Sequence, residues 1–300
     1  MHCRRTLTLL IALGLIAVKP AAQNVSEALR QSALQGDAGA QLALGDIYRI
    51  GQGVPQDFAE AIKWYRLAAA QGSVSAQINL GSMYHLGFGV PKDNAQALQW
   101  YQNPAKQGDP TAEFMMAQLY KDGDGVKQDL PEAVRLFTKL ADAGNPSARS
   151  ELGQLYYEGK GVPQDFAKAM SLLLPIAISG NPYAQLTVGL MYKAGSGVEQ
   201  DRLEADRWIG KSAEWGFVPA QLEYGALLRD GASGQRDRVQ AAKWFLIAAE
   251  RGGPANKSKA EAALNNLQSK LTAPELAAAR KEADAWIKAH QPAYPGHFRN

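Results

Sequence analysis

The sequence of 300 residues contains one cysteine, Cys3, and four histidines. A single thiol excludes an intrachain disulfide framework and a cysteine-based metal site, because both need several cysteines. No two histidines have the spacing that would let one helix hold a metal ion. Only His85 lies inside the repetitive part of the chain, so a Ser-His-Asp hydrolase would depend on that one residue. We therefore expect neither a metal ion nor a cofactor.

Long apolar runs are also scarce. The N-terminal run Leu7–Val18 is shorter than the about 20 residues that a transmembrane helix needs. Two arginines precede it and two alanines follow it, which is the layout of a secretory signal peptide over residues 1–22. Pro20 fits the cleavage site poorly. Two alternatives stay open: an uncleaved leader that anchors the chain in a membrane, and a cytosolic protein.

The chain has no excess of charge of either sign once the leader is set aside. The full chain carries +3 from 32 basic and 29 acidic residues. Arg4, Arg5 and Lys19 belong to the leader, which contains no acidic residue, so the mature chain would be neutral. This balance gives no support to nucleic-acid binding, and we expect no nucleic-acid partner.

What the chain does have is a 36-residue pattern, repeated six times from Asp37 to Gly252 without insertion or deletion. Alanine recurs in all six copies at the positions of Ala40, Ala61 and Ala69. Two further columns are invariant: Gly51, Gly87, Gly123, Gly159, Gly195 and Gly231; and Asp57, Asp93, Asp129, Asp165, Asp201 and Asp237. A period of this length predicts a solenoid, whose units bury their apolar faces against their neighbours. It favours an extended binding surface over a single catalytic pocket.

Each copy predicts two helices. In the first copy, Ala40, Leu44 and Tyr48 lie on one face of a helix that Gly51 can end in the left-handed conformation. Asp57 is a suitable N-cap for the second helix, and Glu60, three residues on, is expected to complete a capping box. This interpretation accounts for the repeated aspartates without a catalytic or metal-binding role.

The second helix has a predicted buried stripe. It comprises Ala61, Trp64, Tyr65, Ala68 and Ala69 in the first copy. The invariant alanines would let helix axes approach closely, while the aromatic residues fill the space between them.

A unit of 36 residues is too small to fold alone, so the array needs caps at its ends. Residues 26–36 repeat only the second half of the pattern. After Gly252, Leu264, Leu267 and Leu271 indicate one capping helix, and Thr272 with Glu275 predicts a capping box for another. The expected segments are a signal peptide (1–22), an N-terminal half-repeat (23–36), six repeats (37–72, 73–108, 109–144, 145–180, 181–216 and 217–252), capping helices (253–290) and a loose tail (291–300).

The unit Ala-x3-Leu-Gly-x2-Tyr-x2-Gly-x-Gly-Val-x2-Asp-x3-Ala-x2-Trp-Tyr-x2-Ala-Ala-x2-Gly, read over residues 40–72, resembles the Sel1-like repeat. The resemblance implies an all-α fold, a right-handed α/α solenoid related to tetratricopeptide arrays. It also implies a protein-interaction adaptor of the secreted bacterial type. A cysteine-rich branch of the family is proposed to bind or hydrolyse penicillins. This chain lacks the cysteines of that branch, so the activity is not carried over.

One column combines cations without any acid, and we call it the basic column: Arg49, His85, Lys121, Tyr157, Lys193 and Arg229. In arrays that resemble tetratricopeptide repeats, this position faces the concave groove. Two interpretations stay open. The column can donate to carboxylates or carbonyls of an extended peptide, or its cations can complement the C-terminal ends of the first helices.

The sequence thus predicts a monomeric, non-enzymatic protein that is periplasmic or secreted and binds an unknown protein or peptide partner. A membrane would be involved only if the leader is retained. The alternative is a secreted enzyme that acts on β-lactams or peptidoglycan fragments, and a third possibility is an effector released into a host cell.

Overall fold

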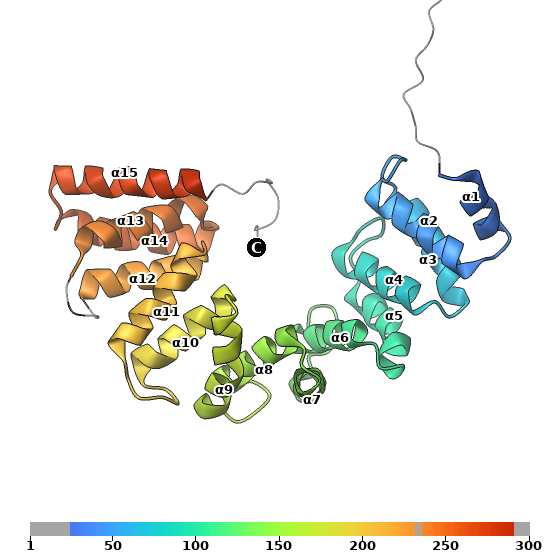
Figure 1. Cartoon of the computed structure of the whole chain (residues 1–300), viewed down its shortest axis with the longest axis horizontal. Coiled ribbons are helices and arrows are strands. Elements are labelled where there is room, and N and C mark those ends of the chain that lie inside the picture. Colours follow the sequence, from blue (N-terminus) through green and yellow to red (C-terminus); the bar gives the residue numbers. More distant parts are fainter. Residues whose placement is uncertain (1–24, 232–233, 235, 291–300) are drawn as a thin grey trace, which may run out of the picture. The chain divides into compact units, whose positions relative to one another are not determined.

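The computed structural model describes residues 25–231, 234 and 236–290, and in this part of the chain all regular secondary structure is α-helical (Figure 1). The expected signal peptide and the expected tail lie outside the described residues. The helices are α1 Glu27–Leu34, α2 Ala38–Ile50, α3 Phe58–Ala70, α4 Val74–Leu86, α5 Asn94–Lys106, α6 Pro110–Asp122, α7 Leu130–Asp142, α8 Pro146–Glu158, α9 Phe166–Ile178, α10 Pro182–Ala194, α11 Arg202–Glu214, α12 Val218–Asp230, α13 Arg238–Arg251, α14 Pro254–Gln268 and α15 Ala273–Ala289.

The chain forms two compact units, and the boundary follows Ala112 inside α6. In the first unit, α1 to α5 pack in chain order, each helix against the next. In the second unit, α7 to α14 do the same, and α15 packs on α13. Each repeat therefore contributes a first helix with an even number and a second helix with an odd number, from α2 and α3 to α12 and α13. None of the described helices has both the length and the apolar character needed to cross a bilayer.

Glycine ends the first helices as the sequence predicts. Gly51 follows α2 with φ of +77°, and its N–H donates to the carbonyl of Ile47. All six glycines of this column have φ between +68° and +77°. Only a residue without a Cβ takes this conformation at little cost, which explains why the position never varies within the chain.

The aspartate column lies at the N-caps of the second helices. Asp57 Oδ1 accepts from the N–H of Glu60 at 2.9 Å, and the other five aspartates accept equivalent bonds. The predicted capping box is wrong in these helices. The N–H of Asp57 donates to the carbonyl of Tyr48 at 2.9 Å, so it has no need of Glu60, whose carboxylate pairs with Lys63 at 2.7 Å.

The reciprocal capping box does form at the start of α15. Thr272 accepts from the N–H of Glu275, and the carboxylate of Glu275 accepts from the N–H of Thr272. Here no preceding helix offers a carbonyl to the N-cap. The side chain at the third helical position therefore supplies the acceptor.

The core follows the predicted stripes with one adjustment. Ala61, Tyr65 and Ala68 are fully buried, whereas Trp64 is half-buried. The first and second helices of a repeat lie so close together that a Cβ added to Gly45 would be 2.4 Å from the ring of Tyr65. A small residue in the first helix thus makes room for the aromatic residue in the second.

Both ends of the array are covered by helices. Ala33 of α1 is buried against Ala40 and Leu44. At the other end, Leu264 and Leu267 of α14 are buried, while Leu271 follows the end of that helix and packs at the edge of the same cluster.

Candidate interaction surface

The basic column occupies the last turn of each first helix. The adjoining loop already satisfies the carbonyl groups at this end in most copies. Gln56 Nε2 donates to the carbonyl of Arg49 at 2.8 Å. Equivalent bonds reach the carbonyls of Lys121, Tyr157 and Lys193 from glutamines seven residues further along the chain. The side chains of the column are therefore available for other contacts.

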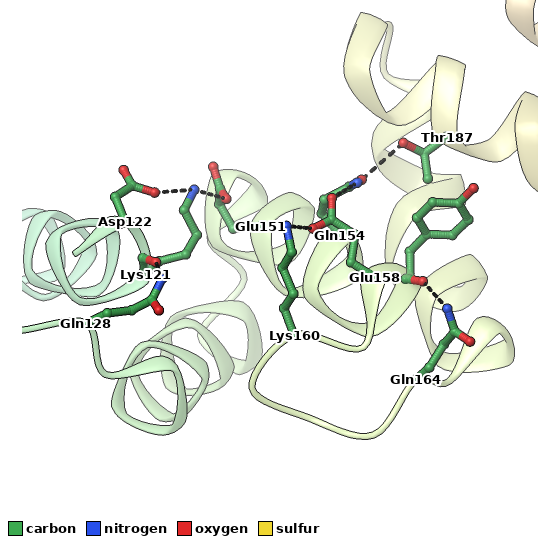
Figure 2. A network of polar contacts seen from close by, with 10 residues as sticks. Lys121, Asp122, Gln128, Glu151, Gln154, Glu158, Lys160, Gln164 and Thr187 are labelled. Atoms are coloured by element: carbon green, nitrogen blue, oxygen red, sulfur yellow. Dashed lines mark hydrogen bonds and ion pairs between the residues drawn. The ribbon is translucent and has the colours of Figure 1, made fainter. Parts of the chain in front are cut away.

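Lys121 uses its side chain to contact the next repeat. Its Nζ lies 2.9 Å from Glu151 Oε2 on α8 and 3.5 Å from Asp122 Oδ1 (Figure 2). Burial alone would lower the pKa of Lys121, but the hydrogen bond and the charge of Glu151 outweigh it, and the pKa is raised. The ammonium group is thus held charged between two repeats.

The same pairing recurs two copies later. Lys193 on α10 lies 3.2 Å from Glu223 on α12, again thirty residues further along the chain. This second pair is more open to solvent: its side chains are 43% and 41% exposed, against 25% and 29% for Lys121 and Glu151. Basic-column lysines are therefore one half of an inter-repeat ion pair.

Between these two pairs the column residue is Tyr157, and amides replace the ion pair. Thr187 Oγ1 donates to Gln154 Oε1 at 3.1 Å, and Gln154 Nε2 donates to Glu158 Oε1 at 2.5 Å (Figure 2). Lys160 lies 2.6 Å from the same carboxylate. Burial would raise the pKa of Glu158, but these two donors lower it. Polar groups thus cross from repeat to repeat here as well.

In the first unit the column is tied to its own repeat. Arg49 Nε donates to Tyr65 Oη at 3.0 Å, and Tyr65 Oη donates to Asp46 Oδ1 at 2.8 Å. Burial and the charge of Asp46 raise the pKa of Tyr65 far above its usual range. His85 Nδ1 lies 2.7 Å from Asn94 Oδ1.

The last member of the column differs. Arg229 turns to its neighbour Asp230, with bonds of 2.7 and 2.9 Å, and it lines a pocket of ≈ 320 Å³ at the C-terminal end of the array. The pocket is lined by residues of α10, α12, α13 and α14: Leu186, Leu190, Pro219, Leu222, Glu223, Ala226, Arg229, Phe245, Asn256, Lys259 and Ala263.

The Sel1 repeat model matches this chain six times, over residues 38–73, 74–109, 110–145, 146–181, 182–216 and 218–253. The chain belongs to the Sel1 repeat family.

Two solved structures show how closely this Sel1 chain follows others. A protective antigen of uropathogenic Escherichia coli strains, which displays an SLR fold, is 32% identical with a TM-score of 0.80. The match covers 89% of this chain and 56% of the antigen, so this chain spans little more than half of its length. A Sel1 repeat protein from Oxalobacter formigenes is 34% identical with a TM-score of 0.62, over 72% of this chain and 89% of that protein. No curated protein matches the chain.

Within the Sel1 array, the basic column thus has a third interpretation beside the two drawn from the sequence. Lys121 and Lys193 connect neighbouring repeats through Glu151 and Glu223. Their ammonium groups bond to the next repeat rather than to the carbonyls of their own helices. Binding of a partner by this column stays a prediction, and any partner would compete with these internal pairs.

The sequence reasoning missed a second Sel1 column that stabilises the stack. Gln41 Nε2 donates to the carbonyl of Ala33, eight residues back in the preceding helix, at 3.1 Å. Gln77, Gln185 and Gln221 make the same bond, and Arg149 makes a longer one. The signal was present as a glutamine in four of six copies at a position buried in the first helix. Each of the four carbonyls that accept from a glutamine also accepts the N–H of a glycine three residues further on, so the amide adds a second hydrogen bond and joins two neighbouring helices.

The aspartates considered as a row of carboxylates are all engaged as helix caps. Among the described residues, no three of the His, Cys, Asp and Glu side chains are grouped as metal ligands would be.

Proposed function

We propose that this Sel1 chain is an exported, non-enzymatic scaffold that binds a protein partner along its first helices. The observation that carries the proposal is the regular placement of polar side chains on those helices in the second unit. The Lys121–Glu151 and Lys193–Glu223 pairs lie at equivalent positions two repeats apart, with the Gln154 network between them. An extended segment laid along these helices would meet similar donors and acceptors at each repeat.

Export is supported by the leader-like composition of residues 1–22 and by the Escherichia coli relative. A protective antigen has to be reached by the immune system, which favours a location outside the cytoplasm. We expect the mature protein to begin near Gln23 and to be found in the periplasmic fraction. Its intact mass checks this expectation, and a mass that still includes residues 1–22 would instead support a membrane anchor.

Photo-crosslinking in the native host tests the binding surface. A photoreactive phenylalanine analogue replaces Gln154 on α8, which belongs to the first helices. The matched control carries the analogue at Lys168, an exposed residue on the second helix of the same repeat. We expect a discrete crosslinked product from position 154 and none from position 168. Crosslinks from 168 alone would place the partner on the other face and contradict the proposal.

A further inference from the structure

The C-terminal pocket lies where the solenoid meets its cap. α14 packs against α12 and α13 in the second unit (Figure 1). The floor is apolar, because Leu186, Leu190 and Leu222 line it. Leu186 is 9% exposed, and the other two are half-buried. The pocket is therefore formed by packed helices, and loops contribute little to it.

The register of α14 explains the charge of this pocket. α14 begins at Pro254, thirty-six residues after Val218 and seventy-two after Pro182, which begin α12 and α10. It thus takes the place of the first helix of a seventh repeat. In this register Lys259 occupies the column of Glu151 and Glu223, the partners of the basic-column lysines.

A charge has therefore been inverted at one position. Lys121 and Lys193 each pair with a glutamate thirty residues further on, whereas the residue thirty positions after Arg229 is Lys259, and both of these cations line the pocket. Arg229 pairs with Asp230 instead. Lys259 is exposed and has no ion-pair partner among the described residues. Two cations and one carboxylate, Glu223, line the pocket, which leaves one positive charge in excess.

We propose that this pocket binds the free C-terminus of a partner protein whose last residue is apolar. One carboxylate between Arg229 and Lys259 would balance the excess charge and relieve the repulsion between the two cations. The last side chain would rest on Leu190 and Leu222. A volume of ≈ 320 Å³ is at the lower end of the range for ligand pockets, which suits a chain end better than a large cofactor. The proposal deepens the proposed function and rests on one part of it, namely that the chain binds a protein partner.

Inorganic phosphate is a poorer fit to the same walls. A dianion would exceed the available positive charge and would lie beside the carboxylate of Glu223. It would also leave the leucines uncovered. The combination of one positive charge with an apolar floor matches a chain end that offers one carboxylate and one apolar side chain.

The test uses fluorescein-labelled tetrapeptides that differ only at the C-terminus, with fluorescence anisotropy as the readout on the full mature chain. The set ends in Leu, Phe, Val or Gly, each as a free acid and as an amide. We expect acids that end in an apolar residue to bind about tenfold or more tightly than their amides, and the glycine acid to bind weakly. Binding should weaken as salt is added.

Lys259→Glu introduces the negative charge that Glu151 and Glu223 have at this position in the interior repeats, and it should abolish peptide binding. Lys257→Glu makes the same charge change on the same helix outside the pocket lining, and it should leave the affinity unchanged. Far-UV circular dichroism confirms that both variants are folded. Three results would overturn the proposal: no acid binds, acids and amides bind equally, or Lys259→Glu binds like the wild type. Displacement of the peptide by millimolar phosphate, with no preference for apolar residues, would also overturn it in favour of a simple anion site.

This test is independent of the crosslinking test. If no peptide binds while position 154 still crosslinks, only the pocket inference fails. If position 154 never crosslinks but peptide acids bind, the proposed binding along the first helices fails and the pocket stands.

Discussion

Lys121 and Arg229 occupy the same position three repeats apart, but the residues thirty positions further on, Glu151 and Lys259, have opposite charges. Lys121 meets Glu151 at 2.9 Å, and the pair joins α6 to α8. Arg229 meets the column in which Lys259 replaces the glutamate, and it turns to Asp230 instead. Both members of the basic column are cations, so the difference in charge comes from position 259, where lysine replaces glutamate.

The comparison shows that the role of a repeated position depends on the residue that it contacts in the next repeat. The basic column alone suggests a row of donors for a partner. Combined with the column thirty residues later, it becomes a set of internal ion pairs in the interior and a charged pocket at the end. The end of the array, where no glutamate follows the cation, therefore offers a pocket that differs in charge from the interior contacts.

The interior and the C-terminal end of the array are expected to be equally well packed. Ala133 in the interior and Ala241 near the end are both fully buried. Enlarging either to leucine should overpack the helix contact and destabilise the protein by roughly 1–3 kcal/mol. Urea unfolding followed by circular dichroism measures the loss, with Ala167→Leu at an exposed position as control.

If Ala241→Leu were tolerated while Ala133→Leu was not, the C-terminal end would be loosely packed. The different pairing of Lys121 and Arg229 would then follow from looser helix packing at the end of the array, and the charge of Lys259 would not be its cause.

The two regions also differ in their helix caps. Asn145 Oδ1 accepts from the N–H of Ala148 at the start of α8, whereas the N-cap of α14 is Gly253, which has no side chain to accept such a bond. Asn145→Ala should cost about 1 kcal/mol, and Gly253→Asn should gain a few tenths of a kcal/mol, roughly 0.3. Thermal unfolding compares the two variants. If both variants lost the same amount of stability, the absence of a side-chain cap would not be what distinguishes the start of α14 from that of α8.

Much of this fold could be predicted from the sequence because its determinants are local. Gly51 ends a helix through its own φ, and Asp57 begins the next through a bond to a residue three positions away. Period and caps follow from the same short-range chemistry. The capping box failed because the carbonyl of Tyr48 in the preceding helix already satisfies the N–H of Asp57, and this depends on how two helices pack.

The pairs that define the candidate surface could not be predicted in the same way. The Lys121–Glu151 pair spans thirty residues, and Gln41 reaches back eight residues to another helix. Both depend on the distance between stacked helices, which no single column encodes. The lysine and glutamate columns read together contain the signal, since Lys121 and Lys193 each have a glutamate thirty residues later.

The third prediction removes the interior pair. Glu151→Gln should cost about 0.5–1 kcal/mol, because the pair is only partly buried. The pKa of Lys121 is raised in the folded chain, so the pair contributes fully below the pKa of an unfolded lysine and is lost as pH rises through the folded value. The difference between wild type and variant should be constant from neutral pH to about pH 9 and should shrink towards zero near pH 12. A difference that persisted at high pH would indicate a packing role for Glu151.

The smallest effect is expected at the end of the array, where Lys259→Glu should convert the pocket into an interior-like contact. The new carboxylate would attract Arg229 across the gap between α12 and α14. Because position 259 is exposed, and the partly buried Arg229 is already paired with Asp230, the gain should be only ~0.2–0.5 kcal/mol. It should disappear in about 1 M salt, where the screening length falls to about 3 Å. Arg229→Gln in the same background supplies the control, since it removes the new pair and should return stability to that of the single Arg229→Gln variant. A Lys259→Glu protein that was less stable than the wild type at low salt would mean that Lys259 has a stabilising contact of its own. The unbalanced charge would then not be what distinguishes the end of the array from its interior.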